Sequence, residues 1–254
     1  MSMFRKWSKS SKSQAEPAPR FEAVLAPAQP FWAIGDVHGC HAQMRSILNY
    51  IDSADSVAPV IFVGDYVDRG EDSKNVLSDI LELQKTADRE VICLKGNHEE
   101  MVLRFLDDPG KTGPGWLRYG GLQTLASFSV RANASDPDQL AQTRDALVEA
   151  MGDEMITWLR EMPSCWVSGK VAVTHAGANP NSPMSEQTTK SLHWGHPDFE
   201  RIPRQDGMWV VHGHTIVDQP KIEAGRISID TGAYATGHLT AAYVSAAGIN
   251  FSTT

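Results

Sequence analysis

The stretch "GDYVDRG" at residues 64–70 directly follows the apolar run "PVIFV" at residues 59–63. A short apolar run that ends in a glycine indicates a buried strand that stops at a turn. The turn itself needs only the glycines, because glycine adopts the unusual backbone angles that tight turns require. Two aspartates and one arginine within seven positions therefore indicate a functional loop at the end of a strand.

The rest of the chain continues this alternation of apolar runs and helical periodicity. The expected order is strand 31–35, helix 41–51, strand 59–64, helix 73–84, strand 90–96 and a helix from Asn97. Such a β-α-β-α-β-α series is typical of a parallel sheet covered by helices. After a mostly helical middle at about 108–162, four further apolar runs return. The last two, "RISIDTG" and "LTAAYVSAAGI", lack a helix between them, which favours antiparallel pairing.

Composition limits the class of protein. The 254 residues suffice for one domain with additions, and 41% hydrophobic with 21% charged residues is ordinary for a globular chain. A formal net charge of −8 argues against nucleic-acid binding and against a general affinity for anionic membranes. Three cysteines without C-x-x-C spacing fit a reducing compartment, so a cytoplasmic location is predicted. No apolar run is long enough to span a membrane.

Residues 1–30 differ in composition from the remainder. They begin with basic residues and contain four prolines, and no long apolar stretch follows the basic residues. We therefore expect a disordered tail rather than a signal peptide, with order beginning near Phe31. Residues 31–254 are expected to form one domain, with residues 108–162 as a helical insert.

Five predicted strands end in clusters of side chains that can bind metal ions. The clusters are "GDVHG" at 35–39, "GDYVDRG" at 64–70, "GNHEE" at 96–100, "THAG" at 174–177 and "HGHT" at 212–215. In open α/β sheets, ligands bind beyond the carboxyl ends of the strands, so these clusters can converge on one crevice. Carboxylate, amide and imidazole groups without a thiolate suit Mn²⁺, Fe or Zn²⁺ better than Ca²⁺. One Asp-x-His turn would mean little, but five such clusters together predict a metal site.

These five motifs resemble those of the calcineurin-like metallophosphoesterase superfamily, in its bacterial branch of PPP-type serine/threonine protein phosphatases. The resemblance runs from about Ile34 to Leu239. It implies an α/β fold, a β-sandwich of mixed sheets flanked by helices, with residues 108–162 as a helical cap. It also implies two divalent metal ions, most commonly Mn²⁺ in bacterial members, with Fe or Zn²⁺ as alternatives.

The resemblance also assigns the metal ligands. One ion would be held by Asp36, His38 and Asp65, and the other by Asp65, Asn97, His175 and His214. Asp65 would bridge the two ions, since a carboxylate has two oxygens and hydrolytic metal pairs lie about 3.5–4 Å apart. Such a pair lowers the pKa of a bridging water, which makes hydroxide available near neutral pH for in-line attack on phosphorus.

By the same resemblance, His98 is the general acid, Asp68 orients it, and Arg69 binds the substrate phosphate together with Asn97. Bacterial relatives usually supply a second phosphate-binding arginine in a Trp-x-Arg pattern after "HAG". Here Trp194 is followed by Gly195 and His196. His196 is the predicted replacement, with Arg201 and Arg204 as alternatives.

Several other residues near the motifs can be explained by structural roles. Tyr234, in "DTGAYATGHLT", is placed near the site or in the packed interior. Glu99 and Glu100 open a helix, where the helix dipole alone favours acidic residues. Trp116 and Tyr119 in the insert are assigned no substrate contact, because aromatics at helical spacing are more often core residues.

Three functions follow from this pattern. The main prediction is a phosphomonoesterase for phosphoserine and phosphothreonine, and also phosphotyrosine, with a phosphoprotein or phosphopeptide as its partner. The alternative is a phosphoanhydride hydrolase that acts on a dinucleoside polyphosphate or a capped RNA end with the same metals. A non-catalytic binding module would have lost a ligand, and all six ligand positions are occupied by suitable residues. The sequence leaves the oligomeric state open.

Overall fold

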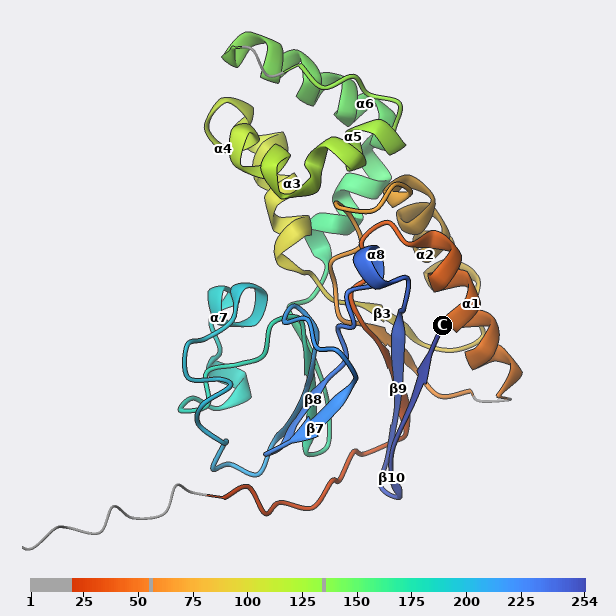
Figure 1. Cartoon of the computed structure of the whole chain (residues 1–254), viewed down its shortest axis with the longest axis vertical. Helices are drawn as coiled ribbons and strands as arrows, with labels where there is room; N and C mark the ends of the chain where they lie inside the picture. Colours follow the sequence, from red (N-terminus) through yellow and green to blue (C-terminus); the bar gives the residue numbers. More distant parts are fainter. Residues whose placement is uncertain (1–19, 55–56, 134–135) are drawn as a thin grey trace, which may run out of the picture.

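The computed structural model describes residues 20–54, 57–133 and 136–254. Two five-stranded sheets form the centre of the molecule, and helices cover their outer faces (Figure 1). The first sheet has the strand order β10-β9-β1-β2-β3, and the second has the order β4-β5-β6-β8-β7. The predicted α/β fold with two mixed sheets is therefore confirmed.

Both sheets combine parallel and antiparallel neighbours. The first contains β1 (Phe31–Ile34), β2 (Val60–Phe62), β3 (Val91–Cys93), β9 (Thr240–Ser245) and β10 (Gly248–Thr253). The second contains β4 (Cys165–Ser168), β5 (Val171–Thr174), β6 (Trp209–His212), β7 (Lys221–Glu223) and β8 (Arg226–Ser228). β1, β2 and β3 are parallel, as are β5, β6 and β8, so the carboxyl ends of each group reach one edge of its sheet.

The core has two parts because successive strand residues point to opposite faces. Phe31 and Ala33 of β1 belong to the cluster between the two sheets, which also contains Val173 of β5. Trp32 and Ile34 belong to the cluster that the helices cover. Strands buried on both faces read as continuous apolar runs, which is how they appear in the sequence.

The helices form two groups. Near the sheets lie α1 (His41–Ser53), α2 (Ser73–Thr86), α7 (Thr189–Trp194) and the short α8 (Ala233–Thr236). A second group stands together at the top of Figure 1, and we call it the cap. It comprises the outer part of α3 (Asn97–Asp107), α4 (Pro109–Trp116), the π-helical turn Leu117–Gly121, α5 (Leu122–Ser127) and α6 (Pro137–Glu161). A single 3₁₀ turn, Met184–Glu186, precedes α7.

The prediction that order begins near Phe31 is wrong, because residues 20–30, the last part of the predicted tail, contact the second sheet. Residues 20–30 run in extended conformation along the second sheet. The Lys170 N–H donates to the Ala26 carbonyl at 2.8 Å, and the indole of Trp209 donates to the Ala23 carbonyl at 3.0 Å. These contacts satisfy backbone groups that a free tail would leave to water. Residues 1–19 lie outside the described part of the chain, so disorder there stays a prediction.

The expected pairing of the last two apolar runs is also wrong. "RISIDTG" supplies β8 of the second sheet, whereas "LTAAYVSAAGI" supplies β9 of the first. α8 lies between them, and β9 instead pairs antiparallel with β1 and β10. Within the described ranges, no helix combines the length and apolar content that crossing a membrane requires.

Candidate active site

The six predicted metal ligands meet where the strands of both sheets end. Asp36 and His38 follow β1, Asp65 follows β2, and Asn97 follows β3. His175 and His214 come from the second sheet, directly after β5 and shortly after β6. Contacts join four of them directly: the backbone N–H of His214 donates to Asp36 at 3.0 Å, and Asn97 Oδ1 lies 2.9 Å from both the His175 and the His214 ring.

Asp65 lies at the centre of two groups of potential ligands. In one group, Asp65 lies with His38 and His98, and in the other with His175 and His214. Within each group the ligand atoms lie within 4.8 Å of one another. His38 Nε2 is 3.4 Å from Asp65 Oδ2, and His175 Nε2 is 3.4 Å from Asp65 Oδ1. The two carboxylate oxygens thus face different groups, as a bridging ligand requires.

The histidine rings are oriented with their lone pairs toward the centre of the site. His38 Nδ1 lies 2.7 Å from the Val67 carbonyl, and His175 Nδ1 lies 3.2 Å from the Val63 carbonyl. A carbonyl only accepts hydrogen bonds, so each Nδ1 carries the proton and each Nε2 presents a lone pair. Burial also lowers the pKa of both rings well below the ordinary value, which keeps them neutral.

These lone pairs point at the amide oxygen of Asn97 and at the carboxylate oxygens of Asp65. His175 Nε2 faces both Asn97 Oδ1 at 2.9 Å and a carboxylate oxygen of Asp65. Acceptors that converge on acceptors repel one another unless a cation lies between them. The donor set therefore fits divalent metal ions, and ring N–H groups bonded to carbonyls are typical of metal-binding histidines.

A further buried carboxylate, Asp230, adds to the negative charge around Asp36 and Asp65. Burial and repulsion by Asp230 and Asp65 raise the pKa of Asp36 well above its usual value. Burial raises the pKa of Asp65 to about 7 and that of Asp230 to about 6. Three carboxyl groups held this close are costly without a compensating cation. Asp230 was not among the predicted site residues, although "RISIDTG" does place it at the carboxyl end of β8.

The backbone is strained at the site. Seven non-glycine residues in the described ranges have positive φ, and five of them are motif residues: His38, Asp65, Asp68, Arg69 and His214. Their φ values lie between 42° and 70°, in the left-handed region that L-residues rarely adopt. Such strain persists only where the surroundings fix it, and it is concentrated at functional sites.

Glu99 fixes the strained loop after β2. Its carboxylate accepts the backbone N–H groups of Asp65 at 2.8 Å, Tyr66 at 2.7 Å and Gly96 at 2.9 Å. Glu99 is fully buried, so these bonds also replace the water that its charge has lost. The sequence analysis explained Glu99 by the dipole of α3 alone. The structure shows that Glu99 also fixes the loop after β2 through hydrogen bonds to its backbone.

His98 and Asp68 form a buried pair. His98 Nδ1 lies 2.7 Å from Asp68 Oδ2, and the remaining His98 nitrogen, Nε2, lies 3.9 Å from Asp65 Oδ2. Burial lowers the pKa of His98, but the Asp65 and Asp68 carboxylates together outweigh burial and raise it above the ordinary value. The ring is therefore suited to carry a proton near neutral pH.

The cap holds Asp68 through two side chains that the sequence did not identify as part of the site. The Trp116 indole N–H lies 3.0 Å from each Asp68 oxygen, and the Thr124 hydroxyl donates to Oδ1 at 2.6 Å. Thr124 also accepts the Asp68 backbone N–H at 2.8 Å. All three side chains are buried. Trp116 is thus a core residue, as expected, and also a hydrogen-bond donor to Asp68 of the His98–Asp68 pair.

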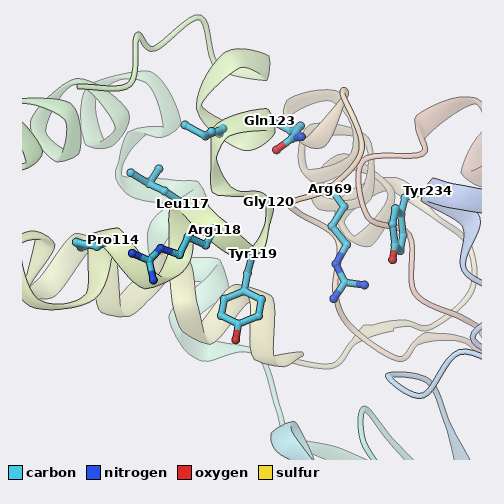
Figure 2. Close-up of a pocket in the computed structure, with 9 residues that line it drawn as sticks. Arg69, Pro114, Leu117, Arg118, Tyr119, Gly120, Gln123 and Tyr234 are labelled. Carbon is cyan, nitrogen blue, oxygen red and sulfur yellow. The ribbon is translucent and has the colours of Figure 1, made fainter. Parts of the chain in front are cut away.

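Arg69 and Tyr234 lie beside this cluster. The Arg69 guanidinium lies over the Tyr234 ring at 4.8 Å, and the Tyr234 ring meets the His38 ring edge-to-face at 5.4 Å. Figure 2 shows the Arg69 and Tyr234 side chains next to each other on one wall of a pocket. Of the two interpretations of Tyr234, these contacts favour a position near the site.

His196, Arg201 and Arg204 are the candidate replacements for the second phosphate-binding arginine. Their described contacts lie outside the cluster of candidate metal ligands. Arg204 is buried and donates to the Asn179 carbonyl at 2.9 Å and the Ser182 carbonyl at 2.8 Å, so it is already engaged in a loop. Exposed Arg201 lies 3.7 Å from Asp198. His196 accepts the backbone N–H groups of Asp198 and Phe199 of its own loop, at 3.2 Å and 2.9 Å. Its role in phosphate binding stays a prediction.

Comparison with known proteins identifies the family. Residues 29–218 match the family of calcineurin-like phosphoesterases. The chain belongs to this family. Membership makes the protein a hydrolase of the phosphoester type and implies divalent metal ions, in agreement with the Asp and His groups described above. The superfamily that the motifs resemble is thereby confirmed.

The relatives of this calcineurin-like phosphoesterase do not support the PPP branch in particular. A bis(5'-nucleosyl)-tetraphosphatase PrpE (asymmetrical) of Bacillus mycoides (strain KBAB4) is 24% identical over 82% of this chain and 87% of its own length. A symmetrical bis(5'-nucleosyl)-tetraphosphatase of Nitrosococcus oceani is 30% identical over 59% of this chain and 44% of its own length.

Solved structures share the fold. The crystal structure of a candidate diadenosine tetraphosphatase superposes with a TM-score of 0.62 at 20% identity, covering 91% of this chain and 98% of the other. A cold-active protein-tyrosine phosphatase of a psychrophilic Shewanella species superposes with a TM-score of 0.59 at 17% identity, covering 90% and 83%. Proteins named for different substrates therefore share this fold.

Proposed function

We propose that this protein hydrolyses a phosphoanhydride bond in a dinucleoside polyphosphate, with water as the nucleophile. The observation that carries the chemistry is the pair of ligand groups that share the two oxygens of Asp65. The substrate class is supported by relatives named as bis(5'-nucleosyl)-tetraphosphatases, which align over 82% of this chain. This substrate is the alternative of the sequence analysis, and it replaces the phosphoprotein as the first candidate.

We assign the following roles to the residues of the site. Asp36, His38, Asp65, Asn97, His175 and His214 would hold two divalent cations, for which we propose Mn²⁺. When bound, these ions lower the pKa of the attacking water and offset the charge of the phosphate. Arg69 binds phosphate oxygens, because its planar guanidinium matches two of them at once. The ring of His98, held by Asp68, donates a proton from Nε2 to the departing oxygen.

Phosphomonoester hydrolysis is the second candidate, and the His98–Asp68 pair favours it. A serine alkoxide is a strong base and must be protonated as it leaves, whereas a nucleotide phosphate is a weaker base and needs less help. A buried acid pair at 2.7 Å is therefore more necessary for a phosphoserine substrate than for an anhydride.

One comparison separates the two candidates. Purified full-length chain loaded with Mn²⁺ is given diadenosine tetraphosphate or a phosphoserine peptide, with a chelator-treated sample as the control. We expect higher kcat/KM on the dinucleotide, and activity that disappears with the chelator. Faster hydrolysis of the peptide would overturn the first candidate in favour of the second.

The His98→Asn variant tests the proton donor on both substrates. General-acid catalysis contributes about 10²–10⁴-fold, so turnover of the phosphoserine peptide is expected to fall by that factor. Turnover of the dinucleotide should fall much less. An equal loss on both substrates would show that His98 serves binding or structure instead of proton transfer.

A further inference from the structure

A pocket of about 930 Å³ adjoins the metal-binding cluster, within the size range of small-molecule sites. Arg69 and Tyr234 form one wall, and the cap forms the other (Figure 2). The cap residues that line it are Pro114, Leu117, Arg118, Tyr119, Gly120, Leu122 and Gln123. The pocket thus continues from the phosphate-binding arginine toward the insert.

The walls carry apolar surface that the fold leaves uncovered. Tyr119 is 61% exposed, Leu122 is 50% exposed and Tyr234 is 38% exposed. Large apolar side chains that gather around one cavity, with a few polar groups among them, are typical of a ligand site. Tyr119 was assigned no substrate contact from the sequence, but its ring lies in the pocket rather than in the core.

The position of Tyr119 relative to Arg69 is fixed by the neighbouring glycine. Gly120 has a φ of +112°, and its carbonyl accepts the Arg69 backbone N–H at 3.4 Å. A β-carbon at Gly120 would lie 2.4 Å from the Arg69 nitrogen, so only glycine permits this approach. The turn that carries Tyr119 is therefore packed directly against the loop that carries Arg69.

The chemistry of the pocket fits a flat, aromatic group joined to phosphate. Tyr119 offers an exposed ring face, and in Figure 2 it lies between the two arginines, Arg69 and Arg118. Base–aromatic stacking and arginine–phosphate contacts are the two interactions that bind nucleotides without a base-specific code. The contact between the Tyr234 and His38 rings joins the same wall to the metal-binding cluster.

We propose that this pocket binds the nucleoside part of the substrate, with the base stacked on Tyr119 and the adjoining phosphate held by Arg69. The proposal deepens the proposed function, on which it rests for the identity of the whole substrate. Arg118, which lies on the other side of Tyr119 from Arg69 in Figure 2, would face the distal part of the ligand.

Equilibrium binding tests the pocket without relying on turnover. Isothermal titration calorimetry on the Mn²⁺-loaded full chain compares adenosine 5′-monophosphate with ribose 5-phosphate, which carries the same phosphate and sugar but no base. Stacking of one base is expected to make the nucleotide bind about tenfold more tightly. Tyr119→Ala should abolish this difference, whereas Tyr119→Phe, which keeps the ring, should retain it. Tyr50→Ala removes an exposed tyrosine outside the pocket and should also retain it.

The outcomes separate this proposal from the proposed function. Equal binding of the two probes by the unmodified protein, or no binding of the nucleotide, would overturn the nucleoside site. A preference that survives in Tyr119→Ala would overturn the role of Tyr119. Hydrolysis of diadenosine tetraphosphate is measured separately, so a chain that prefers the phosphoserine peptide but binds the nucleotide through Tyr119 would contradict only the proposed function.

Discussion

Replacing Thr124 by valine would show how strongly the cap supports the acid pair. Thr124 is fully buried, and its hydroxyl serves Asp68 twice, as donor to Oδ1 at 2.6 Å and as acceptor of the backbone N–H at 2.8 Å. Valine has nearly the same shape but offers neither interaction. The substitution therefore removes hydrogen bonds while adding almost no cavity.

The structure sets the size of the effect. A hydrogen bond to a charged group contributes about 1.5–3 kcal/mol to stability. The loss should lie near the lower end of that range, because Ser73 still contacts the Asp68 N–H at 3.2 Å and Trp116 still donates to the carboxylate. We expect unfolding free energy to fall by about 2 kcal/mol. If a comparable part of that energy orients His98 in the transition state, turnover of an alkyl phosphoester falls roughly tenfold or more.

Urea unfolding and steady-state kinetics on a phosphoserine peptide provide the two readouts. Thr124→Ser is the matched control, because it keeps the hydroxyl and loses only the methyl group. The serine variant should be near the unmodified protein in turnover, and the valine variant well below it. If both variants lose turnover equally, or neither does, the hydroxyl does not position Asp68 and the reasoning fails.

Two further predictions follow from the site. Asp65→Asn should reduce bound metal below two ions per chain, because a neutral amide is a poor bridging ligand, and turnover should fall at least a hundredfold. Mass spectrometry measures the bound metal, and steady-state kinetics measure the turnover. Two bound ions with full turnover would refute the bridging role of Asp65. A hydrogen bond from His193 lowers the pKa of Glu100 to about 2. Its stabilising effect is complete above the ordinary carboxyl value and disappears as pH falls toward about 2. Glu100→Gln should therefore destabilise by about 1–2 kcal/mol at pH 7, since solvent screens part of the interaction, and the difference should vanish in acid. A difference that is constant with pH would contradict this assignment.

The sequence predicted that the six candidate ligand residues converge, because each of them follows an apolar strand within a few residues. Strand ends of a parallel sheet share one edge, so local motifs determined a site built from distant parts of the chain. The support of Asp68 could not be found in this way. Trp116 and Thr124 lie 48 and 56 residues from Asp68, and nothing in their local sequence marks them as its donors.

The two wrong predictions about the fold also concern contacts between parts of the chain that are distant in sequence. The absence of a predicted helix between the last two apolar runs favoured antiparallel pairing, but pairing depends on which sheet each strand can complete, and β9 adds to β1. Residues 20–30 have the composition of a linker, yet their backbone groups bond to the second sheet, which composition does not report.

The cap contacts both Asp68 and Arg69, two residues to which we assign roles in proton transfer and phosphate binding. Within one short segment, Trp116 and Thr124 contact Asp68, and Gly120 contacts Arg69. Asp68 and Arg69 are consecutive residues with positive φ, so a shift of the cap would move Asp68, the partner of His98, together with Arg69. The strand ends position the candidate ligand residues independently of the insert, and structures named as a tetraphosphatase and as a tyrosine phosphatase share this fold. Substrate preference in this chain should therefore depend on residues 114–124 and on Tyr234 far more than on the five ligand motifs.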